Sequence, residues 1–559
     1  MKRIASLLLA AMMIVSLAAC GGTDNGSQNA GNAQTQNNAG SAAASAQDAR
    51  PADYGTPDEI LSRDFSKKIT IQFAGVQGTE GADYNNGNDF NKWWGEKFNI
   101  EFDVINLSWE SWATRVNTWI NADDLPDWTV WTFESANAGS YASQDLIKKV
   151  PDDWRETYPN LSKAADRAPQ NKHYEDAFGG MYYFFRPSFA NNFPADTMTS
   201  YNVIFLRKDW AEQAGYDLSA NEASGTMTLN EFIEYLRAVK EAGITKYPWY
   251  NQPSFLSNAL YAADADGAVK NAFYKGEDGK YHWGPAEESC KVKETLQIVK
   301  DAYDEGLIYP EFYSLDASNE SGYFTTSGEA AAMFYTGIVD NYDLFANQMK
   351  TDLNLDFWEV VDTFILTDEN GTSHEDVGLN AWACNILSPA IDDEKMDRIL
   401  TLWDYACTDY GQTVIRMGLP GVDWEYDEDG NLVNLLAGTD QPLSFYKYQP
   451  ANPALFNMFV LYDDFSLVNP AYSEKARNAT TQMFIKRADI STAKGKEYDW
   501  ALGDYTSQAY TLATMIYADE YANLISKEGD FSTNYDNWVQ EKMRMIRPVL
   551  DDMNATIAD

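Results

Sequence analysis

The sequence predicts an α/β protein of two lobes with a mainly helical C-terminal region. Three observations lead to this prediction. The chain has 559 residues, 45% of them hydrophobic, which is enough for more than one core. Strand-like and helix-like segments alternate with short connections over residues 67–132. A second run of such segments begins near residue 201, and a mainly helical stretch begins near residue 471.

The first run has the order strand, helix, strand, helix, strand. Ile69, Ile71 and Phe73 alternate with smaller or polar residues in the first strand, and a glycine-rich loop follows. The successive elements are expected at residues 67–75, 90–98, 100–105, 112–120 and 128–132. Short connections between such elements predict a parallel sheet with helices on both faces.

The second run opens with a strand and a helix within residues 201–216. A helix follows that starts at Thr228, with Glu231 three residues later in a capping box, and that ends at Gly243. Two Asp-Gly pairs between strand-like arms predict β-hairpins, and apolar periodicity predicts the remaining elements. These hairpins, helices and strands are expected within residues 274–284, 290–306, 328–345, 377–387, 392–408 and 426–434.

The charge and the motif content exclude several functions. With 84 acidic and 42 basic residues the net charge is -42, which would repel a phosphate backbone, so nucleic acid is not an expected partner. His173, His282 and His374 are too scattered for an imidazole metal site, and no phosphate-binding loop or serine-nucleophile motif is present. In residues 423–431, Gly430 comes too early for a calcium loop, so a hairpin is the better interpretation. No cofactor and no metal are predicted.

The N-terminus has the layout of a secretory signal. A positively charged start precedes an apolar run that ends at Ala18, Ala19 and Cys20. The last residues of this run resemble the bacterial lipobox, which implies a signal peptide over residues 1–19 and lipid on the Cys20 thiol. An ordinary signal peptide is the alternative. Residues 20–55 are small and polar, and predict a flexible linker between the lipid and the folded part.

If Cys20 carries lipid, the cysteines that remain are Cys290, Cys384 and Cys407, an odd number. At most one disulfide can form among them within one chain. Free buried thiols are the alternative.

Nine short segments carry a further signal, and apart from the lipobox at Cys20 they span most of residues 60–435. They are the lipobox, NKWWGEKFNIEFDV, INADDLPDWTVW, ETYPNLSK, FGGMYYFFRP, FLRKDWAEQAG, YDEGLIYPEF, TSGEAAAMF and GLPGVDWEYDEDGN. Together they resemble the carbohydrate-binding lipoproteins of bacterial ABC importers, extracellular solute-binding protein family 1, and most closely its large members from Gram-positive bacteria. The last hundred residues match loosely.

The resemblance implies a two-lobed, periplasmic-binding-protein-like fold with a ligand cleft between the lobes. It implies a monomer without catalytic activity, held by lipid on the outer face of the cell membrane, that binds an oligosaccharide and delivers it to membrane permease subunits. The first lobe is expected at residues 56–195 and 375–420, and the second at residues 196–374 and 421–559.

Loops that follow strand ends supply the candidate ligand-binding residues, because ligands of open α/β sheets bind there. The residue types are rings for sugar faces and polar groups for hydroxyls. The candidates are Tyr84, Asn88, Trp131, Glu134, Tyr183, Arg186, Asp340, Asn341, Tyr342, Trp382 and Trp424. The alternatives are core packing for the three tryptophans, a structural salt bridge for Arg186, an N-cap for Asp340 and a solvated turn for the loop that holds Tyr84.

Two other functions stay open from the sequence. A surface-anchored glycan-degrading enzyme needs only two carboxylates at a set separation, which 84 acidic residues can supply anywhere. A receptor of the same fold for a peptide or another solute is the second. The sugar, its linkage and its length are not specified by these patterns.

Overall fold

The computed structural model describes most of the chain after the predicted linker. The described residues are 57–76, 89–108, 111–187, 200–263, 273–315, 320–375, 377, 381–439, 447–448, 465–507, 509–510, 513 and 517–558. The predicted signal peptide, Cys20, Tyr84 and Asn88 lie outside them.

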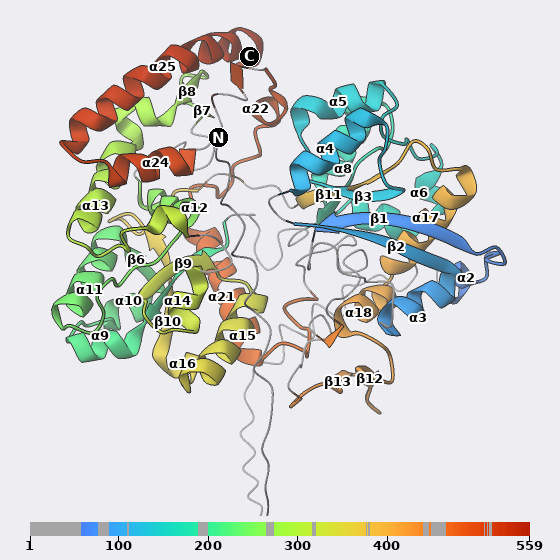
Figure 1. Cartoon of the computed structure of the whole chain (residues 1–559), viewed down its shortest axis with the longest axis horizontal. Coiled ribbons are helices and arrows are strands. Elements are labelled where there is room, and N and C mark those ends of the chain that lie inside the picture. Colours follow the sequence, from blue (N-terminus) through green and yellow to red (C-terminus); the bar gives the residue numbers. More distant parts are fainter. Residues whose placement is uncertain are drawn as a thin grey trace, which may run out of the picture. The chain divides into compact units, whose positions relative to one another are not determined.

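The first lobe is built on a five-stranded sheet with the order β2-β1-β3-β11-β4 (Figure 1). Its strands are β1 (Ile69–Val76), β2 (Ile100–Leu107), β3 (Trp128–Trp131), β4 (Phe184–Pro187) and β11 (Ala381–Leu387). β1 is parallel to β2 and β3, as the alternation of elements predicted, whereas β11 is antiparallel to β3 and β4. This antiparallel strand, β11, is added to the first sheet when the chain returns to it after the strands of the second sheet.

Helices lie on both sides of the first sheet. In Figure 1, α4, α5 and α8 lie on one side, and α2, α3 and α18 lie on the other. The helices of this lobe are α2 (Pro57–Leu61), α3 (Asp89–Phe98), α4 (Trp112–Ala122), α5 (Ser135–Ser143), α6 (Trp154–Thr157), α7 (Pro159–Ala165), α8 (Pro169–Phe178), α17 (Asp393–Ala406) and α18 (Asp409–Met417).

The second lobe is built on a four-stranded sheet with the order β6-β10-β5-β9. Its strands are β5 (Asn202–Arg207), β6 (Thr226–Thr228), β9 (Ala332–Thr336) and β10 (Val361–Thr367). β6 is parallel to β10, while β5 is antiparallel to both β9 and β10. The carboxyl ends of β6, β9 and β10 therefore lie along one edge.

The helices of the second lobe include the predicted C-terminal ones. They are α9 (Lys208–Ala214), α10 (Ser219–Ser224), α11 (Leu229–Glu241), α12 (Pro253–Leu256), α13 (Val292–Asp304), α14 (Glu320–Thr325), α15 (Val339–Gln348), α16 (Phe357–Val360), α21 (Glu474–Ile490), α22 (Trp500–Asp504), α24 (Tyr517–Ser526) and α25 (Phe531–Thr556). The capping box at Thr228 and Glu231 is confirmed at the start of α11. α24 and α25 pack against α13 (Figure 1).

Both predicted hairpins are confirmed. β7 (Phe273–Lys275) pairs with β8 (Tyr281–Trp283), and β12 (Trp424–Tyr426) pairs with β13 (Leu432–Asn434). In the second hairpin, Asp427 Oδ1 accepts hydrogen bonds from the backbone N–H groups of Asp429 (3.0 Å) and Asn431 (2.7 Å). This carboxylate thus closes a turn, as the hairpin interpretation of this segment expected.

Each sheet has its own hydrophobic core. Trp424 and Tyr448 belong to the core of the first lobe, and the Tyr448 hydroxyl donates to Asp423 Oδ2 at 2.6 Å. The lobe boundaries stay a prediction, but this packing favours moving the boundary after residue 420 to a position beyond Tyr448.

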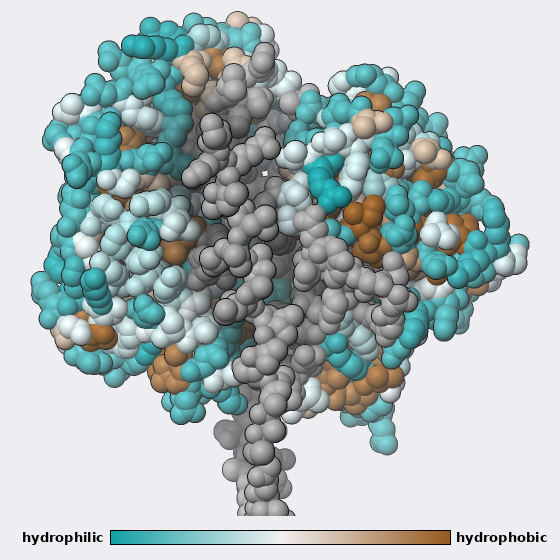
Figure 2. Space-filling model, in the orientation of Figure 1, coloured by the Kyte–Doolittle hydropathy of each residue, from teal (hydrophilic) through white to brown (hydrophobic). Residues whose placement is uncertain are grey.

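Cys290, Cys384 and Cys407 are free thiols, so the described part of the chain contains no disulfide among them. Burial raises the pKa of the Cys384 thiol well above its ordinary value, which disfavours the reactive thiolate. None of the helices in the described ranges is both long and apolar enough to cross a membrane. The visible face is mainly hydrophilic, with scattered hydrophobic patches (Figure 2).

The chain passes between the two sheets after β4, after β10 and again before α21. Arg487 of α21 joins these passages, since its guanidinium donates to Glu375 Oε1 and to the carbonyl oxygen of Asn202 at the start of β5. The side chains of Arg487 and Glu375 are 0% and 1% exposed. Ser373 adds a hydrogen bond from its hydroxyl to Glu375 Oε1 at 2.8 Å.

Replacing Arg487 tests this junction. Arg487→Ala would leave the Glu375 carboxylate buried without its cationic partner, so the free energy of unfolding should fall by about 3–5 kcal/mol. Guanidinium denaturation followed by circular dichroism measures the change. Lys494→Ala is the control, because Lys494 and Asp489 form a pair whose side chains are 59% and 70% exposed, and it should cost less than about 1 kcal/mol. Equal losses in both variants would contradict the assignment.

Candidate functional site

The candidate residues of the first lobe gather at one edge of its sheet. β1, β2, β3 and β4 run in one direction, so their carboxyl ends share an edge, where ligands of open α/β sheets bind. Trp131 ends β3 and Arg186 lies next to the end of β4. Trp382 is the second residue of the antiparallel β11, so its backbone lies at the same edge, although its side chain is outside the described part. Tyr84 and Asn88 follow β1 in sequence and are likewise undescribed.

The backbone at this edge departs from regular geometry. Phe133 and Ala383 have φ angles of 59° and 56°, a region that residues with a side chain rarely occupy. The pairing of β11 with β4 also shifts register between Ala381 and Cys384. Strained residues and bulges concentrate next to functional sites, which supports this edge as the functional region.

Trp131 is fully buried rather than presented to solvent. Its Nε1 donates to Asn117 Oδ1 at 2.9 Å, and its ring packs against those of Tyr141 and Tyr183 at 5.8 and 5.7 Å between centroids. Tyr183 is buried too, and its hydroxyl donates to the carbonyl oxygen of Ala138 at 2.7 Å. Both rings therefore belong to the core in this structure, where neither offers a face for stacking on a sugar.

Trp424 and Arg186 are also buried. Trp424 is 1% exposed, and its Nε1 donates to the carbonyl oxygen of Gly418 at 2.8 Å. Its ring contacts Tyr410 and Tyr426 at the base of the β12–β13 hairpin. Arg186 is 0% exposed. The core alternative thus accounts for Trp424, and the Arg186 guanidinium is not presented at the surface.

Among the predicted residues of the first lobe, Glu134 places a carboxylate at the carboxyl edge of the sheet. It precedes α5, is half-buried, and accepts hydrogen bonds from Asn117 Nδ2 at 2.6 Å and Asn137 Nδ2 at 2.8 Å. Each carboxylate oxygen keeps lone pairs for a further donor. The pattern of the sequence singled out neither asparagine. Asn117 meets Glu134 only because α4 packs beside the loop after β3, whereas Asn137 lies three residues after Glu134 in α5.

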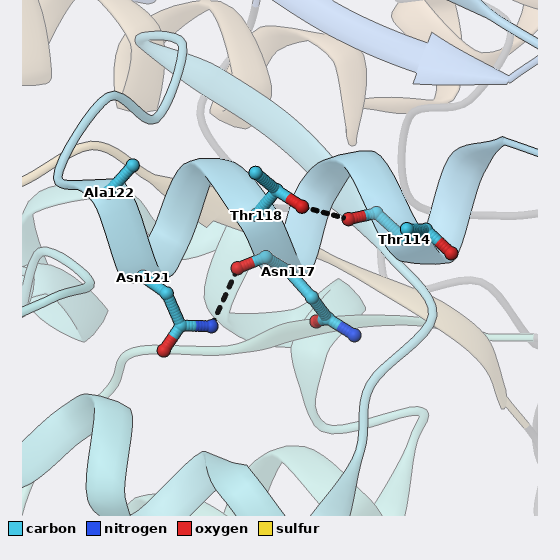
Figure 3. A pocket seen from close by; sticks show the side chains of 5 residues that line it. All are labelled: Thr114, Asn117, Thr118, Asn121 and Ala122. Atoms are coloured by element: carbon cyan, nitrogen blue, oxygen red, sulfur yellow. Dashed lines mark hydrogen bonds between the residues drawn. The ribbon is translucent and has the colours of Figure 1, made fainter.

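The polar face of α4 borders an open cavity of about 530 Å³ (Figure 3). In the same view Asn117 and Asn121 extend from one side of the helix, and Asn121 Nδ2 donates to the carbonyl oxygen of Asn117 at 2.7 Å. The lining residues are Thr114, Asn117, Thr118, Asn121 and Ala122. The threonine and asparagine side chains among them continue the hydrogen-bonding surface that Glu134 begins.

The candidates of the second lobe follow the carboxyl end of β9. α15 begins at Val339, with Ile338 as its N-cap, so the N-cap alternative for Asp340 is wrong; Asp340 instead accepts a hydrogen bond from the Tyr472 hydroxyl. Asn341 is half-buried and donates to the carbonyl oxygen of Thr336 at 3.0 Å.

Tyr342 is part of the core of the second lobe. It is 1% exposed, and its hydroxyl donates to Thr363 Oγ1 at 3.1 Å. Burial raises the pKa of Tyr342 to about 12. Of the three neighbouring candidates, Asp340 and Asn341 reach the surface of this lobe and Tyr342 does not.

The packing of Trp131 leads to a test that separates core from binding surface. Trp131→Ala removes a fully buried ring and the donor to Asn117, so the free energy of unfolding should fall by about 3–5 kcal/mol. Thermal and denaturant unfolding measure this. Trp119→Ala is the control, because Trp119 lies on the adjacent helix α4 and its ring is only half-buried. Its removal should lower the free energy of unfolding by less. An unchanged melting temperature for Trp131→Ala would show that the ring is not a core element.

Comparisons with known proteins agree with this architecture. Among solved structures, an EF-hand mutant of FusA, an ABC-transporter substrate-binding protein of S. pneumoniae, in complex with fructo-nystose is 16% identical with a TM-score of 0.64, covering 87% of this chain and 98% of its own. A human-milk-oligosaccharide (HMO) binding, ABC-transporter-associated protein from Bifidobacterium longum infantis is 14% identical with a TM-score of 0.58 and coverages of 86% and 96%. The N-glycan transport protein NgtS of Streptococcus pneumoniae is 14% identical with a TM-score of 0.57 and coverages of 87% and 98%.

At these identities the structural matches show the two-lobed fold and no more. Among curated proteins, no sequence matches this chain. The model of the bacterial extracellular solute-binding protein family matches residues 87–366, which is half of the chain. The chain therefore belongs to the bacterial extracellular solute-binding protein family.

Proposed function

We propose that this chain is a substrate-binding lipoprotein that captures an oligosaccharide outside the cell and delivers it to the permease subunits of an ABC importer. Its family consists of binding proteins rather than enzymes, which sets the glycan-degrading alternative aside. Of three structures that share its fold, one is in complex with fructo-nystose, one is described as HMO-binding, and one is described as an N-glycan transport protein. These names support an oligosaccharide as the solute.

The observation that carries the proposal is the held carboxylate of Glu134. Two amides fix its orientation at the carboxyl edge of the first sheet, beside the polar cavity of α4. A carboxylate fixed in this way accepts hydrogen bonds from sugar hydroxyls without first having to be ordered, which lowers the entropy cost of binding. Asp340 and Asn341 supply the corresponding polar groups in the second lobe, and Tyr84, Asn88 and Trp382 remain proposed contacts.

Ligand binding tests this function. A thermal-shift screen of fructo-oligosaccharides, milk oligosaccharides, N-glycans and short peptides should give a shift with a sugar, because ligand at a hundredfold excess over Kd stabilises by about 2.7 kcal/mol. Glu134→Ala should weaken that sugar by about tenfold in calorimetry, equal to roughly 1.4 kcal/mol. Glu101→Ala is the matched control, since Glu101 lies near the amino end of β2 and pairs with Lys68 at 2.7 Å.

Two results would speak against the proposal. A shift with peptides alone would indicate a receptor for another solute. Equal affinity of Glu134→Ala and the unaltered chain would remove Glu134 from the site.

The anchor is a separate part of the proposal. We infer that Cys20 carries lipid and holds the protein on the outer face of the membrane of a Gram-positive cell as a monomer. Cells grown with a clickable palmitate analogue should label the protein, and Cys20→Ser should remove the label and release the chain into the medium. Cys407→Ser should keep both label and membrane fraction. Label retained on Cys20→Ser would contradict lipidation at this residue.

A further inference from the structure

A short segment of the second lobe extends the edge at which β9 ends. Trp249 forms a parallel bridge with Ala332, the first residue of β9. Two residues later, the side chain of Asn251 pairs with the backbone of Phe334, donating to its carbonyl oxygen at 2.9 Å and accepting from its N–H at 2.7 Å. Gln252 follows, so it lies near the carboxyl end of β9.

A buried carboxylate holds Gln252. Glu320 is 0% exposed, and its Oε2 accepts from the backbone N–H of Gln252 at 2.8 Å and from Asn251 Nδ2 at 3.1 Å. Its Oε1 accepts from Gln252 Nε2 at 2.8 Å. Burying a carboxylate costs several kcal/mol, so the hydrogen bonds from this segment are needed to keep it there.

This contact fixes which way the Gln252 amide faces. An ionised carboxylate only accepts hydrogen bonds, so the amide must turn its NH₂ group toward Glu320. Its Oε1 then points the other way, on a side chain that is half-buried. The amide of Asn341 is fixed in the same sense, because its Nδ2 donates to the carbonyl oxygen of Thr336. Both side chains therefore keep an acceptor oxygen for an outside donor.

We infer that Gln252, oriented by Glu320, is a ligand-contacting residue that makes the site selective for neutral, hydroxyl-rich oligosaccharides over anionic ones. The inference rests on the proposed function. Gln252, Asn341 and Glu134 all offer acceptors, which match the hydroxyl donors of a neutral sugar. A uronate or sialyl carboxylate brings acceptors and a negative charge, which the Glu134 carboxylate and the net charge of -42 oppose.

The solute itself can be identified by capture. The purified chain is incubated with a neutral and an acidic fraction of mixed plant and milk oligosaccharides, and retained sugar is released and identified by mass spectrometry. The inference expects sugar from the neutral fraction and none from the acidic fraction. Retention of acidic sugar, alone or together with neutral sugar, would overturn it while leaving an oligosaccharide receptor in place. Retention from neither fraction would overturn the proposed function, and the inference with it.

The role of Gln252 is measured with the retained sugar by calorimetry. Gln252→Ala removes one donor to the buried Glu320 carboxylate, so it should lower the melting temperature, and at a temperature where the variant is fully folded it should weaken binding by about tenfold. Gln297→Ala is the matched control, because Gln297 Nε2 donates to Asp301 Oδ1 at 2.7 Å on the surface of α13. Affinity of Gln252→Ala equal to that of the control would overturn the inference.

A double-mutant cycle separates positioning by Glu320 from general damage. Glu320→Gln allows the Gln252 amide to rotate by 180°, so this substitution alone should weaken sugar binding. In the Gln252→Ala background it should cause no further loss of affinity. A loss of equal size in both backgrounds would show that Glu320 acts on folding alone.

Discussion

The buried ion pair of Arg487 and Glu375 is the constraint on which the two-lobed architecture depends. It ties α21, the segment after β10 and the first residue of β5 to one point, where three passages between the sheets begin. A charge pair in the core is stable only when its geometry is nearly complete, because desolvation otherwise exceeds the attraction. The passages therefore meet the second lobe at fixed positions.

The same physical device recurs at both sheet edges. A carboxylate that can only accept hydrogen bonds turns the amides around it, so that Glu134 fixes Asn117 and Asn137 while Glu320 fixes Gln252. The polar groups are then ordered before a ligand arrives. Side chains that are already held lose less entropy on binding, which is how a site of few hydrogen bonds reaches useful affinity.

Sequence patterns predicted what is local and missed what is distant. Alternation over Ile69–Phe73 gave β1, and the capping box gave the start of α11, since both depend on neighbours in the chain. The partners of Asn117 and Gln252 are 17 and 68 residues away, so no spacing rule connects them. For Trp131, periodicity placed the strand correctly but did not show that the ring packs against Tyr141 and Tyr183, and this burial decides its role.

The abundance of aromatic residues is explained first by the cores. The chain has 17 tryptophans, and among those whose side chains the structure describes, eight are fully buried: Trp94, Trp128, Trp131, Trp154, Trp249, Trp283, Trp403 and Trp424. Large rings fill two sheet-and-helix cores efficiently, so their number alone does not indicate a sugar. The proposal of a sugar rests instead on the placement of hydrogen-bond acceptors at the strand ends, together with the family. Under that proposal, rings that stack on a sugar would come from residues beside those ends, for which Tyr84 and Trp382 remain the proposed candidates, and not from the buried set.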